Sequence, residues 1–135
     1  MYFDEDEFKR WLEQAEHTLR SASSDLKSGD YNWACFKSQQ AGEYSVKALL
    51  RGLGKPAFGH SILKLVKELK ETGVSAPEEL ESLARSLDRH YVPPRYPNAY
   101  PAGSPFEFYD ARVAQEAIES AERLLEFIRE ERQKL

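Results

Sequence analysis

The chain has 135 residues and a mass of 15.5 kDa, about 0.9 of a typical 150-residue domain, so we expect a single domain over 1–135. Hydrophobic residues make up 41% of the chain and charged residues 31%, a balance that excludes disorder as the main state. The 19 basic and 23 acidic residues give a net charge of -4, so the protein as a whole repels phosphate backbones. Any contact with nucleic acid therefore requires a local basic patch.

Apolar residues recur at spacings of three and four along 4–28, 31–53 and 60–72, which predicts three helices separated by glycines. Asp4 and Asp30 are suited to cap the first two of these helices. The second helix carries two apolar stripes, and we therefore expect it to be central in the fold.

A fourth helix is predicted from a capping box at Ser75, with Pro77 in its first turn, to about Tyr91. Residues 92–109 hold five of the seven prolines, which excludes both a helix and a central strand there, and Asp110 caps a last helix. No segment shows a strand pattern. The sequence predicts an all-α, antiparallel up-and-down bundle of four long helices with one shorter helix between the second and the fourth.

Several features bear on compartment and chemistry. The single cysteine, Cys35, cannot form an internal disulfide, the N-terminal residues are acidic, and no apolar run reaches the roughly 20 residues of a membrane span. We therefore expect a cytoplasmic protein without a membrane segment. His17, His60 and His90 lack metal-ligand spacing, and no glycine-rich phosphate loop is present. We predict no metal, no cofactor and a structural role for Cys35, because no base is placed beside it.

Residues 85–100 gather basic and aromatic side chains in an otherwise acidic protein, against one acid, Asp88. Arginine binds phosphate oxygens in pairs and tyrosine stacks on bases, which suits a nucleotide or single-stranded RNA. The alternative is an ordinary solvated helix end, with Arg85 and Arg89 paired to Glu81 and Asp88. Composition leaves both open. The candidate residues are Arg85, Arg89, His90, Tyr91, Arg95, Tyr96 and Tyr100.

Helical geometry limits how these residues converge. Arg85 and His90 are five residues apart, about 140° around a helix and about 7.5 Å along it. They meet if the arginine wraps around, if the helix end distorts before Pro93, or if a second subunit completes the pocket, and only the last also makes a cleft. Gln39, Gln40 and Glu43 are weaker candidates for the same cleft, or else polar residues satisfied at a helix interface.

Three stretches of the chain resemble the HEPN domain family, and the similarity extends over nearly all 135 residues. They are 31–50, which contains Gln-Gln-Ala-Gly-Glu and Lys-Ala-Leu-Leu, then 59–63, Gly-His-Ser-Ile-Leu, and 87–97, which ends in Tyr-Val-Pro-Pro-Arg-Tyr-Pro. The resemblance implies a dimerising bundle of about five helices, often encoded beside a minimal nucleotidyltransferase in toxin–antitoxin pairs. Our leading hypothesis is a homodimer that binds nucleotide or RNA without turnover, in which the ligand-binding residues are Arg85, Arg89, His90, Tyr91, Arg95 and Tyr96.

The resemblance also supplies an alternative activity. Ribonuclease members of the family carry Arg-x4-6-His, and Arg85 to His90 fits that spacing. By analogy, His90 moves a proton and Arg85 stabilises the charged phosphorane, without a metal. The segment Tyr91 to Pro97 instead resembles members regarded as nucleotide binders. A non-catalytic structural partner subunit is the third possibility.

Overall fold

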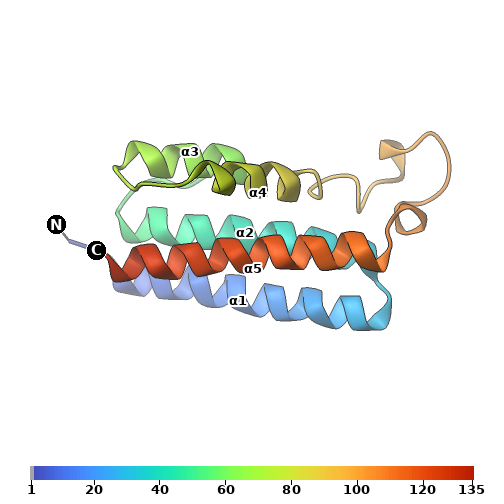
Figure 1. Ribbon diagram of the computed structural model, residues 1–135, viewed down its shortest axis with the longest axis horizontal. Helices are drawn as coiled ribbons and strands as arrows, with labels where there is room; N and C mark the ends of the chain where they lie inside the picture. Colours follow the sequence, from blue (N-terminus) through green and yellow to red (C-terminus); the bar gives the residue numbers. More distant parts are fainter. Residues whose placement is uncertain (1) are drawn as a thin grey trace.

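The computed structural model describes residues 2–135, and it is all-α, as predicted from the sequence. Figure 1 shows three long helices lying side by side, and this part of the chain contains no strand. None of its helices combines the length and the apolar composition that a bilayer crossing requires. The helices are α1 (Glu5–Ser28), α2 (Tyr31–Gly52), α3 (Ile62–Glu71), α4 (Glu78–Asp88) and α5 (Ala111–Gln133).

The helix ends follow the predicted caps in part. Asp4 Oδ1 accepts a hydrogen bond from the Glu7 N–H at 3.1 Å, and Gly29 ends α1 with a positive φ of 81°. Asp30 occupies the N-cap position of α2, but its side chain makes no capping bond. The capping box predicted at Ser75 is not formed: α4 begins at Glu78, so its N-cap is Pro77, and Ser75 lies too far from the first free N–H groups.

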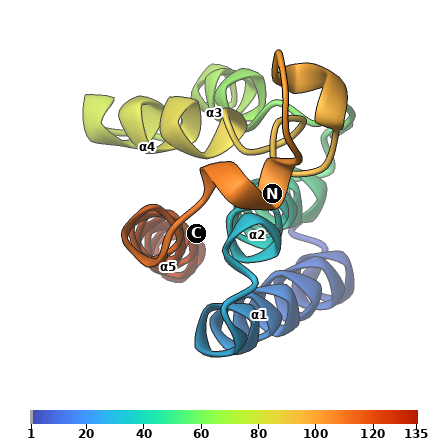
Figure 2. The ribbon, with the colours of Figure 1, turned by 90° about the vertical axis from the view of Figure 1, so that its right-hand side faces the viewer.

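The helices form two layers around α2. Figure 2, viewed along the bundle, places α2 between α1, α5 and the layer made by α3 and α4. This position confirms the central role that the two apolar stripes of α2 predict. Fifteen of its 22 residues are buried, including polar ones such as Gln39 and Glu43.

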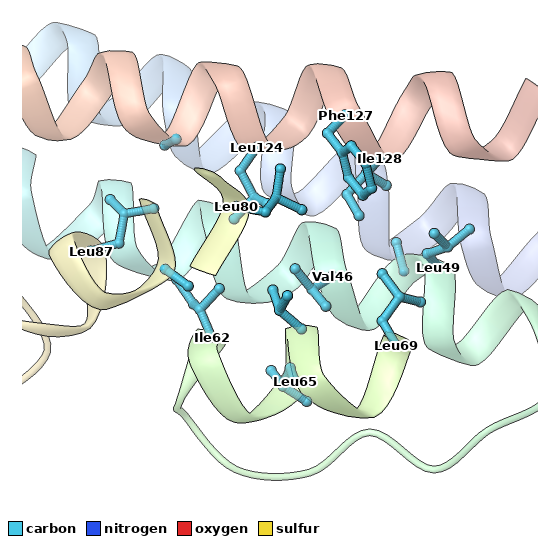
Figure 3. Packing of buried hydrophobic residues seen from close by; sticks show 14 of the residues in the cluster. Val46, Leu49, Ile62, Leu65, Leu69, Leu80, Leu87, Leu124, Phe127 and Ile128 are labelled. Carbon is cyan, nitrogen blue, oxygen red and sulfur yellow. The ribbon is translucent and has the colours of Figure 1, made fainter. Parts of the chain in front are cut away.

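The helix directions and lengths differ from the predicted up-and-down arrangement. In Figure 3, Ile62 and Leu69 on α3 follow the same direction as Val46 and Leu49 on α2, so these two helices are parallel. The cause is the connection 53–61, which runs back along α2 until Gln39 Nε2 donates a hydrogen bond to the His60 carbonyl at 2.8 Å. α3 then starts beside the middle of α2 rather than at its end.

α4 is also short, with 11 residues, so the bundle has three long helices and two short ones. It ends at Asp88 rather than near Tyr91. Pro93 drives Val92 out of the helical region, and before it the chain tightens into a turn in which the His90 N–H donates to the Leu87 carbonyl at 2.9 Å. The segment after Asp88 therefore turns away from the α4 axis and enters the long loop.

The core is tightly packed at Gly42, where α2, α3, α4 and α5 meet. A Cβ atom there would lie 2.9 Å from Ile62 Cδ1, 3.1 Å from Leu87 Cδ1 and 3.2 Å from Leu124 Cδ2. Figure 3 shows these leucine and isoleucine side chains converging from the three helices that cover α2. A side chain at this position would require these neighbouring Cδ atoms to shift.

The loop 92–109 contains two 3-10 turns, η1 (Pro97–Ala99) and η2 (Pro105–Phe108), where the sequence predicts no helix. Each turn begins with proline, whose missing N–H is not needed at the first helical position. The loop is anchored by Asn32 Nδ2, which donates to the Pro94 carbonyl at 3.1 Å. The rings of Tyr100 and Phe108 stack with their centroids 4.1 Å apart. The loop is thus an ordered part of the fold.

Candidate functional site

Asp88, at the end of α4, caps a different helix. Its Oδ1 accepts from the Ile62 N–H at 2.9 Å and from Gln39 Nε2 at 3.2 Å. Its Oδ2 accepts from the Leu63 N–H at 3.0 Å and from Ser61 Oγ at 3.1 Å. A carboxylate at a helix N-terminus is stabilised by the free N–H groups and the helix dipole. Asp88 therefore joins α4 to the start of α3.

A polar network lies along α2, next to this cap. Glu43 is nearly fully buried, and its Oε2 accepts from the Lys47 ammonium at 2.9 Å. Gln40 Nε2 donates to Gln39 Oε1 at 2.8 Å and to Glu43 Oε1 at 3.3 Å. Buried polar groups need such partners, because an unpaired charge in the interior is costly. The α2 polar network comprises Gln39, Gln40, Glu43, Lys47 and His60.

His60 carries this network to the surface. Its Nδ1 lies 3.2 Å from Glu43 Oε1, so an N–H at that position donates to the buried carboxylate. The ring also stacks on Tyr91, with centroids 4.8 Å apart and planes inclined by 16°. The imidazole is more than half exposed. Glu43 thus fixes the orientation of His60, and His60 fixes one face of Tyr91.

Arg95 lies among three aromatic rings, and we call Phe36, Tyr91, Arg95 and Tyr96 the aromatic–arginine cluster. Its guanidinium carbon is 4.2 Å from the Phe36 centroid, 4.8 Å from that of Tyr91 and 5.0 Å from that of Tyr96. Arg95 Nε donates to the Tyr91 carbonyl at 2.9 Å. Its terminal nitrogens have no hydrogen-bond partner within residues 2–135. The cluster therefore presents an oriented guanidinium beside an exposed ring, Tyr96.

Arg85 and Arg89 lie outside this cluster. Arg85 Nη2 is 3.6 Å from Glu81 Oε1, and Lys70 pairs with the same carboxylate. The hydrogen bond from Lys70, with the nearby Lys70 and Arg85 charges, lowers the pKa of Glu81. Arg89 is exposed and forms no ion pair in the part of the chain that the structure describes. The Arg85 pairing is the one that the solvated-helix-end alternative anticipates.

His90 packs against the end of the loop 92–109. Its ring meets Tyr109 edge-on at 5.9 Å, and its Nδ1 is buried without a hydrogen-bond partner. Burial, with a smaller effect of the Arg89 charge, lowers the pKa of His90. The imidazole is therefore neutral at pH 7.

The structure brings together some of the predicted site residues. Tyr91, Arg95 and Tyr96 form one cluster, and Gln39, Gln40 and Glu43 reach it only through His60. Sequence reasoning did not include Phe36 or His60 in the site. Their signals were available, because Phe36 lies one helical turn before Gln40 and His60 lies in one of the family-like stretches.

The described residues also bear on metal binding and nucleophilic chemistry. Residues 2–135 contain no group of three or more His, Cys, Asp or Glu side chains that could hold a metal ion. Cys35 is completely buried, and burial raises the pKa of its thiol to about 12. A thiol that stays protonated and shielded is a poor nucleophile, which agrees with a structural role.

The architecture and the site define a small all-α module with an arginine held on an aromatic surface beside a buried polar network. The HEPN domain family model matches residues 8–131, and the chain belongs to this family.

A relative from Methanocaldococcus jannaschii, named "Putative toxin MJ1304", is 31% identical over 134 residues, covering 90% of this chain and 86% of that protein. The crystal structure of TT1696 from Thermus thermophilus is similar with a TM-score of 0.89 and 46% identity, covering 92% of this chain and 97% of the other. The crystal structure of ST0689, described as an archaeal HEPN homologue, has a TM-score of 0.76 and 38% identity, covering 90% of this chain and 94% of the other. The crystal structure of an HEPN domain protein from Thermotoga maritima, tm0613, has a TM-score of 0.75 and 34% identity, covering 93% of this chain and 99% of the other.

Proposed function

We propose that the protein binds nucleotide or single-stranded RNA at the aromatic–arginine cluster, without turning it over. The observation that carries this proposal is the way in which neighbouring side chains orient the Arg95 guanidinium. Three rings and one hydrogen bond hold its guanidinium, while its terminal nitrogens remain open to a phosphate. The half-exposed ring of Tyr96 offers a stacking surface beside it.

Charge and stacking together make such a site effective in an acidic protein. The net charge of -4 disfavours phosphate backbones in general, so binding depends on the local cation. Stacking of one base on an aromatic side chain contributes about 1–3 kcal/mol and tolerates any base. Arg89, which is exposed directly after the end of α4, supplies a second positive charge to this end of the molecule.

We further propose that the binding form is a homodimer that works with a minimal nucleotidyltransferase in a toxin–antitoxin-like pair. Family membership supports the dimer, and the toxin name of the archaeal relative supports the pairing. A gene for a nucleotidyltransferase next to this one favours the pair. If the protein binds that partner but no nucleotide or RNA, the third possibility holds, and the chain is a structural partner subunit.

Titration of labelled single-stranded RNA at two salt concentrations tests the binding site. We expect Arg95→Ala to weaken binding about tenfold and to reduce the salt dependence by about one charge, because one phosphate contact is lost. Tyr96→Ala weakens binding at least about fivefold through lost stacking. Arg112→Ala is the control, since Arg112 is an exposed α5 arginine outside the loop. Equal affinities for wild type and Arg95→Ala contradict the proposal.

A metal-independent ribonuclease is the second candidate, and the state of His90 is the observation in its favour. An imidazole that is neutral at pH 7 can accept a proton from a 2′-hydroxyl group. This candidate requires RNA cleavage in EDTA that disappears in His90→Ala and Arg85→Ala while the circular dichroism spectrum is unchanged. The absence of cleavage by the purified wild type, separated from any partner protein, excludes it.

A further inference from the structure

A hollow opens next to the aromatic–arginine cluster, between the α1–α2 turn and the loop 92–109. Its volume is about 400 Å³, within the roughly 300–1,000 Å³ of small-molecule sites. The first turn of α2 forms one wall of the hollow, and the loop 92–109 forms the opposite wall. The lining residues are Gly29, Asp30, Asn32, Trp33, Pro94, Arg95, Pro105 and Phe106.

Two aromatic side chains of the hollow are open to solvent. Trp33 is 44% exposed and Phe106 is 67% exposed, although folding usually hides rings of this size. Trp33 is steadied by an edge-on contact with Phe36, at 6.3 Å between centroids and 80° between planes. Phe106 lies in η2, directly after Pro105, which is buried. The hollow therefore offers exposed rings on elements that are fixed.

Two charged side chains that line the hollow, Asp30 and Arg95, keep polar atoms without a partner in residues 2–135. Asp30 is exposed, and its carboxylate makes no capping bond to α2 and no hydrogen bond or ion pair with any residue of 2–135. Arg95 also lines the hollow, and its terminal nitrogens are likewise without a hydrogen-bond partner in this range. Asn32, by contrast, is engaged with the Pro94 carbonyl. One free acceptor group and one free cation thus share a cavity that has aromatic walls.

We propose that this hollow is a subsite for the guanine base of a ribonucleotide, and this inference rests on the proposed nucleotide-binding function. A planar base stacks on Trp33 and Phe106. The Asp30 carboxylate has two acceptor oxygens, which match the two parallel N–H donors on the Watson–Crick edge of guanine. Adenine offers one amino donor beside a ring acceptor that repels the carboxylate. Arg95 takes the phosphate and offsets the Asp30 charge.

A second copy of the chain is a poorer occupant. Covering the hollow with an apolar protein surface would bury the Asp30 carboxylate without a partner, which is costly. A guanine base instead satisfies that carboxylate with hydrogen bonds.

A second hollow on the molecule serves as an internal comparison. It lies at the connection 53–61, has a similar volume of about 420 Å³, and contains one exposed ring, Phe58. Its charged lining residues are two lysines and two glutamates, among them Glu68, which pairs with the exposed Lys64. Its lining residues include no second aromatic ring and no arginine, although the Arg51 guanidinium carbon lies 5.9 Å from the Phe58 centroid. Phe58→Ala is the control for Phe106→Ala.

Calorimetric titration of the full-length protein with GMP, IMP and AMP tests the subsite. A bidentate contact to a base edge discriminates by about 1–3 kcal/mol, so we expect GMP to bind at least about fivefold more tightly than AMP. IMP, which lacks the 2-amino group, falls between them. Asp30→Asn brings GMP and AMP to within about twofold, because the amide has only one acceptor oxygen. Phe106→Ala weakens both at least about fivefold, and Phe58→Ala changes neither.

Short RNAs of otherwise uniform sequence, with and without one guanine, distinguish the source of the base. Guanine preference with GMP and with RNA supports a site for either source, and preference only with RNA supports the subsite for an unpaired residue of a strand. Equal binding of GMP and AMP, still lost in Arg95→Ala, overturns the guanine subsite and leaves the proposed function standing. No binding of any nucleotide or RNA overturns both.

The oligomeric state gives an independent check. Sedimentation of wild type, Trp33→Ala and Phe106→Ala at the same concentrations shows whether the hollow is an interface between copies. Unchanged sedimentation with weakened nucleotide binding supports the subsite. Dissociation of the protein with unchanged nucleotide binding overturns it.

Discussion

The α2 polar network and the loop end of the molecule use the same residue types in opposite ways. Glu43 and Asp88 have their carboxylate oxygens occupied by donors from the protein itself. Asp30 and Arg95, at the loop end, keep polar atoms without partners in the described chain. The two aspartates make the clearest contrast: Asp30 precedes α2 without capping it, whereas Asp88, the last residue of α4, caps the start of α3. Occupied groups stabilise the fold, whereas unoccupied groups are available to a ligand.

The strongest test of this contrast is Glu43→Gln. The substitution removes the charge that neutralises the buried Lys47 ammonium and should cost about 3–5 kcal/mol of unfolding free energy. Urea denaturation followed by circular dichroism measures it. Glu68→Gln is the control, since Glu68 pairs with the exposed Lys64 and should cost less than about 1 kcal/mol. Similar losses in both variants would remove the distinction between the network and the surface.

The two aspartates provide the next test. Asp88→Ala should cost about 3 kcal/mol, because four hydrogen bonds to the α3 end and to Gln39 are lost. Asp30→Ala should cost less than about 0.5 kcal/mol, since its side chain makes no capping bond. Both are measured by denaturation under one set of conditions. A large cost for Asp30→Ala would show that its carboxylate has a structural task.

A smaller effect is expected inside the loop. Phe108→Ala removes the stacked contact with Tyr100 and should cost about 1 kcal/mol. Because Phe108 is half exposed, the cavity left behind is small. Amide hydrogen exchange should show faster opening confined to 92–109. Equal acceleration in α2 would mean that the loop and the core open as one unit.

The smallest effect concerns pH and His90. Burial lowers the pKa of His90 in the folded protein, so the unfolded chain binds more protons as the pH falls below about 6.5. Stability is therefore lost as the pH falls below about 6.5, towards the lower pKa of His90 in the folded state. His90→Gln should weaken this pH dependence, which urea denaturation at several pH values measures. An identical pH profile in wild type and His90→Gln would contradict the burial of the neutral ring.

The helices were predictable because their signals are local. The helices expected over 4–28 and 31–53 agree to within one residue at each end with the observed Glu5–Ser28 and Tyr31–Gly52. Apolar spacing and glycine stops act within a few residues, so the sequence alone carries them. The end of α4 was less predictable, because Asp88 is held by N–H groups at the start of α3, 25 and 26 residues away in the sequence. The candidate site was partly predictable: Tyr91, Arg95 and Tyr96 are close in sequence, whereas His60 and Phe36 join them only through folding.

The sequence by itself determined the all-α class, the five helices and a basic, tyrosine-rich segment around the prolines, because these depend on composition and on contacts between near neighbours. Tertiary structure alone decided that α3 runs parallel to α2, that Asp88 caps α3, and that His60 links a buried carboxylate to Tyr91. It also decided that the Asp88 carboxylate is hydrogen-bonded within the protein and that the Asp30 carboxylate is not. The physical reason is that hydrogen bonds and ring contacts across 17 to 62 residues depend on packing geometry, which no local pattern encodes.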